Sequence, residues 1–122
     1  MNYPKSIVDY YIKKINKEIP VSGVLLFGSF AYGKPTKDSD VDLVVLSDAF
    51  RKMDFDERLD WLIERRDKKT YGIAMDIIGY TPSEFRDIEK HSAIMVVAKK
   101  RGKWIYQKWV YQRNGFSVDN FS

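Results

Sequence analysis

A near-continuous apolar run from Val21 to Phe27, Val-Ser-Gly-Val-Leu-Leu-Phe, constrains the fold more than any other segment of the chain. Such a run is typical of a strand buried on both faces, which requires helices on either side of its sheet. Segments 40–46 and 71–80 have a similar apolar character and predict a second and a third strand. The sequence therefore predicts a layered α/β fold, formed by a single domain over residues 1–122.

Helical patterns alternate with these strands. Apolar residues recur at helical spacing from Pro4 to about Glu18, and again in a helix from Asp54, its N-cap, to Lys68. The second helix carries its predicted apolar face on Phe55, Leu59, Leu62 and Ile63. A capping box with proline in the first turn, Thr81-Pro82-Ser83-Glu84, predicts a third long helix to about residue 100. A short helix over 28–32 and a last strand over 103–110 complete the expected order.

Composition narrows the class of protein. The chain has no cysteine, which excludes disulfides and thiolate metal sites. No segment has the apolar length of a membrane span, and the first residues lack the apolar core of a signal peptide. We therefore expect a cytoplasmic protein without a membrane partner. The formal net charge of +4 favours anionic partners such as nucleotides, although so small an excess is also typical of an ordinary solvated surface.

Two acids open the second strand. Asp40 and Asp42 are two residues apart, so on a strand both carboxylates project from the same face, while Val41 and Leu43 project into apolar packing. Two neighbouring anions repel each other and lose hydration, and a divalent cation is the usual compensation. Oxygen ligands alone favour Mg²⁺ or Mn²⁺ over zinc.

The end of the first strand supplies a complementary feature. Gly28 allows a sharp turn and a close approach of the backbone to a ligand, and Ser29 adds a hydroxyl donor. A helix that begins here directs free N–H groups at an anion. The pair therefore predicts a phosphate-binding turn opposite a metal site, the arrangement that a nucleoside triphosphate requires.

A third acid, Asp76, is the only charge in the apolar segment 73–79. We expect it to be buried, and a lone buried carboxylate is costly without a partner. If its strand lies beside the second strand, the three acids can hold two cations about 4 Å apart, the arrangement for in-line phosphoryl transfer.

One spaced motif resembles the defining motif of the DNA polymerase beta-like nucleotidyltransferase superfamily: Gly28-Ser29, followed after ten residues by Asp40-Val41-Asp42. The short chain and the Asp76-Ile77-Ile78 segment are similar to its minimal nucleotidyltransferase (MNT) branch, over a core region of residues 21–85. The resemblance implies an α/β (α+β) fold, the polymerase beta-like palm, with a mixed β-sheet of three to four strands flanked by helices. It also implies roles: Asp40 and Asp42 bind both metals, Asp76 binds one and helps to deprotonate the acceptor, and Gly28 and Ser29 contact the β- and γ-phosphates.

The same resemblance implies an activity and a partner. The expected reaction is transfer of AMP from ATP to a hydroxyl acceptor, with Mg²⁺ or Mn²⁺ as cofactor and pyrophosphate as the second product. Minimal members often act as antitoxins of a small helical HEPN protein, to one of whose tyrosines they add AMP. A HEPN-type helical protein is therefore the expected partner, within a homo- or hetero-oligomer.

Alternatives remain open at the level of sequence. One is transfer to a small molecule such as an aminoglycoside, although relatives of that kind usually carry a second helical domain. Another is a non-catalytic module that only binds a toxin, although a pure binder need not keep three clustered acids.

Residues outside the motif point to other roles. We expect His91 to be structural or exposed on a helix, and Lys34 and Lys37 to be solvated loop residues in preference to triphosphate ligands. The basic, aromatic segment 103–122, which includes Trp104, Tyr106, Trp109 and Tyr111, predicts a protein interface or packing on the sheet, and nucleic acid is the less favoured partner.

Overall fold

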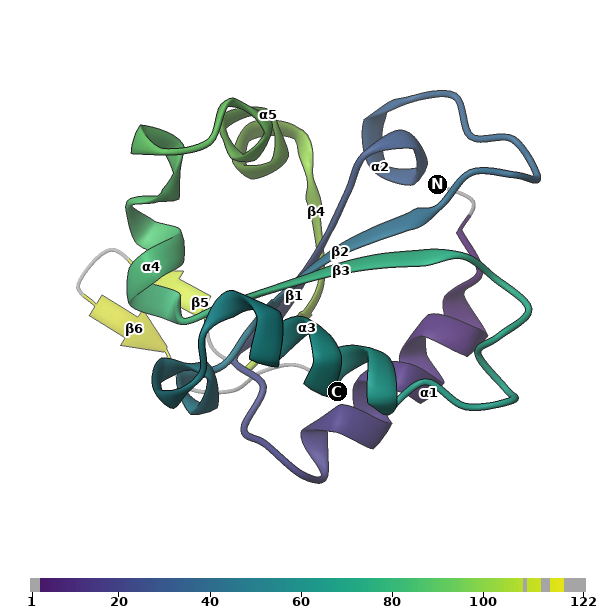
Figure 1. Cartoon of the computed structure of the whole chain (residues 1–122). Helices are drawn as coiled ribbons and strands as arrows, with labels where there is room; N and C mark the ends of the chain where they lie inside the picture. Colours follow the sequence, from purple (N-terminus) through teal and green to yellow (C-terminus); the bar gives the residue numbers. More distant parts are fainter. Residues whose placement is uncertain (1–2, 109, 113–114, 118–122) are drawn as a thin grey trace.

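The computed structural model describes residues 3–108, 110–112 and 115–117, with side chains over 3–108. A mixed four-stranded sheet lies at the centre, in the order β3-β2-β1-β4 (Figure 1). Its strands are β1 (Gly23–Phe27), β2 (Val41–Leu46), β3 (Met75–Tyr80) and β4 (Lys103–Gln107). Strand β1 is antiparallel to both β2 and β4, whereas β2 and β3 are parallel. The mixed sheet predicted for this chain is confirmed. A separate pair of short strands, β5 (Val110–Gln112) and β6 (Gly115–Ser117), follows β4.

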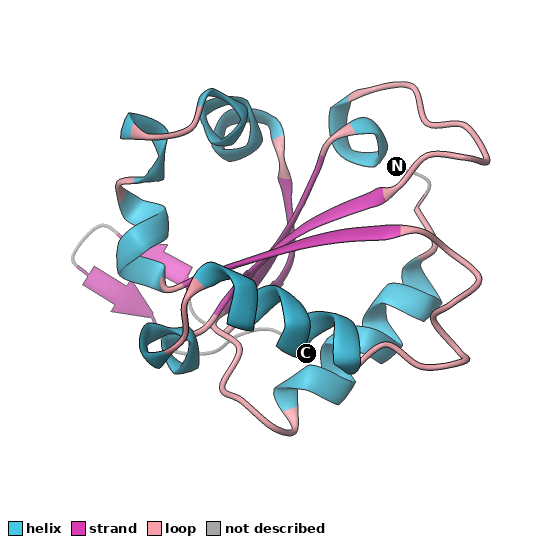
Figure 2. Ribbon diagram, in the orientation of Figure 1, coloured by secondary structure: helices cyan, strands magenta, loops and turns pink. Residues whose placement is uncertain are grey.

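Helices cover both faces of the sheet (Figure 2). Helices α1 (Lys5–Asn16) and α3 (Phe55–Glu64) lie on one face, and α4 (Pro82–Arg86) and α5 (Ala93–Arg101) lie on the other. Strand residues alternate between the two resulting cores: Leu26 and Leu43 pack with α1, whereas Leu25 and Val44 pack with α4 and α5. All five residues of β1 are buried, as the apolar run predicts for a strand covered on both faces.

Several elements are shorter than the sequence predicts, and among them the last strand, predicted over 103–110, ends at Gln107. The helix predicted over 54–68 ends at Glu64, and the strand predicted over 71–80 begins only at Met75. The helix predicted from Pro82 to about residue 100 is broken into α4, a 3-10 turn η2 (Ile88–Lys90) and α5. The break follows from Ser92, whose side chain accepts a hydrogen bond from the Met95 N–H and caps a new helix. A further 3-10 turn, η1 (Asp48–Lys52), was not predicted.

Helix α3 buries a different face from the one predicted. Phe55, Leu59 and Ile63 are 54%, 41% and 51% exposed, and of the predicted apolar face only Leu62 is buried. Arg58 is buried in their place at 4% exposure. Its guanidinium donates hydrogen bonds to the backbone carbonyls of Phe50, Met53 and Gly79. It also donates to both carboxylate oxygens of Glu84, at 2.7 and 3.0 Å. The arginine thus joins α3 to η1, β3 and α4, and this satisfies a charge that would otherwise be costly to bury.

The predicted helix caps are confirmed. Asp54 and Glu57 form a reciprocal capping box at the start of α3, and Thr81 and Glu84 form another at the start of α4. In the part of the chain that the structure describes, no helix is sufficiently long and apolar to cross a membrane.

Candidate active site

The turn at the end of β1 requires a glycine at position 28. Gly28 has a φ of 72°, in the left-handed region, and helix α2 (Ser29–Tyr32) begins directly after it. A Cβ atom at this position would also overlap the Oδ2 oxygen of the Asp42 carboxylate. The backbone of the turn therefore lies against the first candidate metal ligand. Helix α2 is a single turn of four residues, so its dipole adds little to the free N–H groups that the sequence predicts at this turn.

Two of the predicted acids lie side by side on neighbouring strands. Asp42 on β2 is paired in register with Asp76 on β3. Because directly paired residues of neighbouring strands project from the same face of a sheet, both side chains lie on the face that also bears Val44 and Tyr80 toward α4 and α5. Asp42 is also paired with Phe27 at the end of β1, which places it between the glycine turn and Asp76.

The other predictions about these acids are corrected in part. Asp40 lies just before β2 and is exposed, whereas the prediction placed it on the strand. Asp76 is exposed as well, although we expected a lone buried carboxylate. The reason is strand order: β3 is an edge strand, so one side of Asp76 has no neighbouring strand. Only Asp42 is partly buried.

The three acids influence one another electrostatically. Burial, which is the largest cause, and the negative charges of Asp76 and Asp40 together raise the pKa of Asp42 from 3.8 to about 6. A carboxyl that retains its proton so close to neutral pH indicates negative charge that the protein itself does not compensate. A bound cation would supply that compensation.

The donor set fits a hard divalent cation in its chemistry, because it consists of carboxylate oxygens alone. Among the residues that the structure describes, however, no three His, Cys, Asp or Glu side chains are grouped closely enough to hold a metal ion. The metal ligands thus remain a prediction, made by chemistry and strand register.

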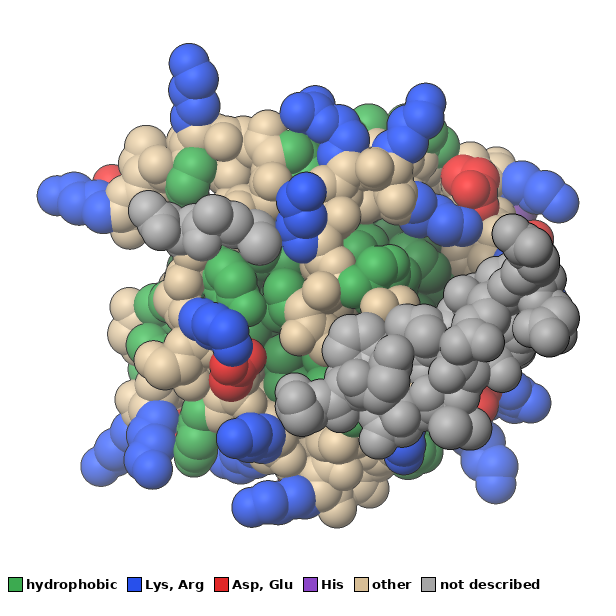
Figure 3. Space-filling view, turned by 180° about the vertical axis from the view of Figure 1, so that it is seen from behind, with side chains coloured by type: hydrophobic (Ala, Val, Ile, Leu, Met, Phe, Trp, Pro, Cys, Tyr) green, Lys and Arg blue, Asp and Glu red, His purple; other side chains and the backbone are tan. Residues whose placement is uncertain are grey.

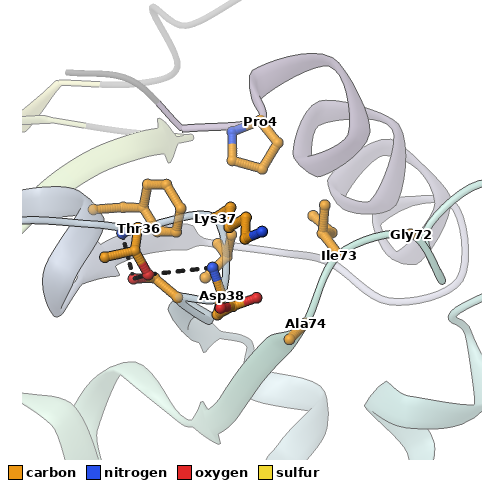
Figure 4. A pocket seen from close by; sticks show the side chains of 10 residues that line it. Pro4, Thr36, Lys37, Asp38, Gly72, Ile73 and Ala74 are labelled. Carbon is orange, nitrogen blue, oxygen red and sulfur yellow. Dashed lines mark hydrogen bonds between the residues drawn. The ribbon is translucent and has the colours of Figure 1, made fainter.

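A cavity of about 450 Å³ opens at the same end of the sheet (Figure 4). It lies on the face that α1 covers, since Phe30, Val41 and Ile73 line it and belong to the core around α1. Asp42 and Asp76 project from the opposite face, toward α4 and α5, whereas Asp40 stands in the chain between two lining residues, Ser39 and Val41. The full lining consists of Pro4, Phe30, Thr36, Lys37, Asp38, Ser39, Val41, Gly72, Ile73 and Ala74.

The remaining sequence candidates lie in less central places. Lys34 and Lys37 are exposed loop residues, as predicted, and Lys37 also lines the cavity. His91 is exposed as expected, but it lies in the turn between η2 and α5 and not within a helix. Trp104 is itself in strand β4, is 41% exposed, and packs edge to face on Phe85 of α4, with ring centroids 6.0 Å apart. Trp109 and the side chain of Tyr111 lie outside the described residues.

One basic residue near the site was missed. The guanidinium carbon of Arg101, at the end of α5, lies 5.0 Å from the ring centroid of Tyr32 in α2. The sequence shows a basic cluster at 99–103, but no local pattern connects it to a helix some seventy residues earlier.

Comparison with known proteins identifies the class. Residues 9–104 match the family described as "Nucleotidyltransferase domain". Since this match covers most of the chain, the chain belongs to that family. A Methanocaldococcus jannaschii protein named "Putative protein adenylyltransferase" is 35% identical over 74 residues, which are 61% of this chain and 72% of that protein. The nucleotidyltransferase resemblance of the sequence is thereby confirmed at the level of the family.

Solved structures support the fold. A crystal structure titled as a putative nucleotidyltransferase from Sulfolobus solfataricus aligns with a TM-score of 0.58 at 16% identity, over 92% of this chain and 84% of that one. BolA1 from Arabidopsis thaliana aligns with a TM-score of 0.51 at 20% identity, over 64% of this chain and 94% of that one. At these identities the likeness concerns the fold alone, and the argument for function depends on the site.

Proposed function

We propose that this nucleotidyltransferase transfers AMP from ATP to a hydroxyl group of another protein. The observation that carries the proposal is the in-register pair of Asp42 and Asp76 beside the left-handed Gly28 turn. Phosphoryl transfer needs little covalent participation by a protein and depends on positioning and charge stabilisation. Acids that converge from two strands next to a close-approach glycine suit that task.

Asp40, Asp42 and Asp76 are the residues that would hold Mg²⁺ or Mn²⁺. The cation would neutralise the triphosphate and lower the pKa of the attacking hydroxyl. The raised pKa of Asp42 supports this assignment, because a cation would offset both the burial and the neighbouring negative charges that keep a proton on the carboxyl.

The protein's own groups have separate roles in the proposed reaction. The backbone at Gly28 and the hydroxyl of Ser29 bind the β- and γ-phosphates and orient the triphosphate. A carboxylate oxygen of Asp76 accepts the proton of the acceptor hydroxyl, since this residue is exposed on an edge strand and an incoming chain can reach it. A new bond forms between the acceptor oxygen and the α-phosphorus, the bond from that phosphorus to the bridging oxygen breaks, and pyrophosphate leaves.

A protein acceptor is supported by two features. The similar Methanocaldococcus protein carries the name of a protein adenylyltransferase. Asp76 is exposed on an edge strand, where a side chain carried by another protein can reach it. A tyrosine of a HEPN-type helical protein, as in the MNT branch that the sequence resembles, is the acceptor we propose, with this chain as the antitoxin of the pair.

The proposal is tested by co-purification from the native cell, followed by mass analysis of the bound partner. We expect the partner to carry one added AMP when it is produced with the wild-type chain. With the Asp40→Asn, Asp42→Asn double variant, it should still bind but lack the addition. A non-catalytic binding module predicts instead that the partner is unmodified with both chains. Modification that persists with the double variant would show that the acids are assigned wrongly.

A further inference from the structure

The three basic residues that end α5 have different surroundings. The Lys99 ammonium points back toward α4, where it donates hydrogen bonds to Glu89 and to the Phe85 and Arg86 carbonyls. Lys100 is exposed. Arg101 alone of the three stacks on α2, the helix that begins at the Gly28 turn. A single guanidinium therefore contacts the short helix that begins at the predicted phosphate-binding turn.

The position of Arg101 is fixed by packing on its other side. Gly102 follows it directly and lies so close to β1 that a Cβ atom there would be 2.9 Å from the Leu26 carbonyl oxygen and would overlap that of Ala98. Leu26 is two residues before Gly28. The turn from α5 to β4 is thus held against the end of β1, and Tyr32 holds the side chain from the α2 side. Two independent contacts place the charge at this end of the sheet.

The guanidinium is available for a ligand. Arg101 is exposed, and within the described part of the chain it takes part in no ion pair. Stacking on an aromatic ring leaves the N–H donors at the edge of the guanidinium plane open, in the fork geometry that binds phosphate oxygens in pairs. Figure 3 shows that Lys and Arg side chains dominate the charged groups on the back of the molecule.

We propose that Arg101, oriented by Tyr32, binds the β- and γ-phosphates of the nucleotide and makes the site selective for a nucleoside triphosphate over a monophosphate. This inference rests on the proposed function and adds a residue that the nucleotidyltransferase motif does not contain. Triphosphate and carboxylates bring many negative charges to one place, and one arginine on the α5 side offsets part of them. The same contact stabilises pyrophosphate as it leaves.

The test measures nucleotide affinity of the full chain by titration calorimetry in Mg²⁺, with ATP, pyrophosphate and AMP as probes. Arg101→Ala should weaken binding of ATP and of pyrophosphate by about 10- to 100-fold, the usual effect of losing a charged hydrogen-bonded pair. Binding of AMP should change less than about twofold, because AMP lacks both contacted phosphates. Arg101→Lys should restore only part of the loss, since an ammonium is a point charge without the planar fork.

Two matched variants test whether Tyr32 positions Arg101. Tyr32→Phe keeps the ring and should bind ATP like the wild type, whereas Tyr32→Leu should lose part of the affinity. Lys90→Ala removes an exposed charge near the start of α5 and controls for net charge. Circular dichroism melting of each variant separates loss of affinity from loss of fold.

The outcomes are distinguishable. A selective loss of ATP and pyrophosphate in Arg101→Ala, with Lys90→Ala unchanged, supports the assignment. Wild-type affinity of Arg101→Ala for ATP, or an equal loss in Lys90→Ala, overturns it and leaves the proposed function intact. If the wild-type chain itself binds no ATP in Mg²⁺, the proposed function fails and this inference fails with it.

Discussion

Asp42→Asn should make the protein more stable and should abolish its activity. The wild-type carboxylate is partly buried beside two other acids, and its pKa is raised from 3.8 to about 6 by that burial and by their charges. At neutral pH and without a cation, the folded protein therefore contains an unfavourable charge. Asparagine has nearly the same shape as aspartate and no charge, so the substitution removes the unfavourable free energy of the partly buried charge.

The magnitude follows from the pKa shift. A shift of one pKa unit corresponds to about 1.4 kcal/mol, which sets an upper limit of about 3 kcal/mol for this carboxyl. Water still reaches part of the side chain and screens it, so we expect a gain of about 1–2 kcal/mol in the free energy of unfolding. In a domain of this size the gain should raise the Tm by about 4–8 °C.

The dependence on pH has a definite sign. The unfolded chain releases this proton near pH 3.8, while the folded protein retains it up to about pH 6. Wild-type stability should therefore fall as the pH rises through this window and then level off. The stability difference between Asp42→Asn and the wild type should be near zero at pH 4 and greatest above pH 6.

Urea unfolding in EDTA at pH 4.0 and pH 7.5 measures this difference. Asp60→Asn, at an exposed position of α3, is the control and should change stability by no more than about 0.5 kcal/mol. Added Mg²⁺ should stabilise the wild type and should have little effect on Asp42→Asn. A variant that is no more stable than the wild type at pH 7.5, or equally stabilised at both pH values, would refute this account of the acids.

Three further changes test other parts of the structure. Gly28→Ala should lower the free energy of unfolding by more than about 2 kcal/mol, measured in urea, because alanine disfavours the left-handed φ and its methyl group would overlap the Asp42 carboxylate. An unchanged stability would contradict the described geometry of this turn. Arg58→Met should lower the free energy of unfolding by about 3–5 kcal/mol, because it leaves a carboxylate and several carbonyls without their donor. The control Arg51→Ala, which removes an exposed ion pair, should lower it by less than about 0.5 kcal/mol. Equal losses in the two variants would exclude a structural role for the buried arginine. Hydrogen bonds from Tyr10 and Lys14 of α1 lower the pKa of Asp67 to about 2. Asp67→Asn should therefore be less stable than the wild type above pH 4, and the difference should vanish toward pH 2 when unfolding is measured across an acid titration. A difference that is the same at every pH would contradict this prediction.

Local chemistry made the strands and the central acids predictable. The apolar run over 21–27 required a strand covered on both faces, and the period of two placed Val41 and Leu43 in the core opposite Asp42. The glycine turn was predictable as well, although its contact with Asp42 was visible only in three dimensions.

What the sequence could not predict depends on neighbours distant in the chain. The exposure of Asp76 follows from the edge position of β3, and strand order is not encoded in any one strand. Helix α3 has apolar residues over a wide arc, and the hydrogen bonds of Arg58 to three other segments decide which part of that arc is buried. The stacking of Arg101 on Tyr32 likewise requires α5 and α2 to meet at one end of the sheet.

The central claim is that Asp40, Asp42 and Asp76 jointly bind divalent cations. Electron paramagnetic resonance of Mn²⁺ titrated into the protein with ATP measures this binding directly. We expect bound Mn²⁺ with the wild type and with Asp38→Asn, a substitution of an exposed acid in the adjacent loop. Asp42→Asn and Asp76→Asn should each bind Mn²⁺ at least about tenfold more weakly. Unchanged Mn²⁺ affinity in both of these variants would contradict the claim.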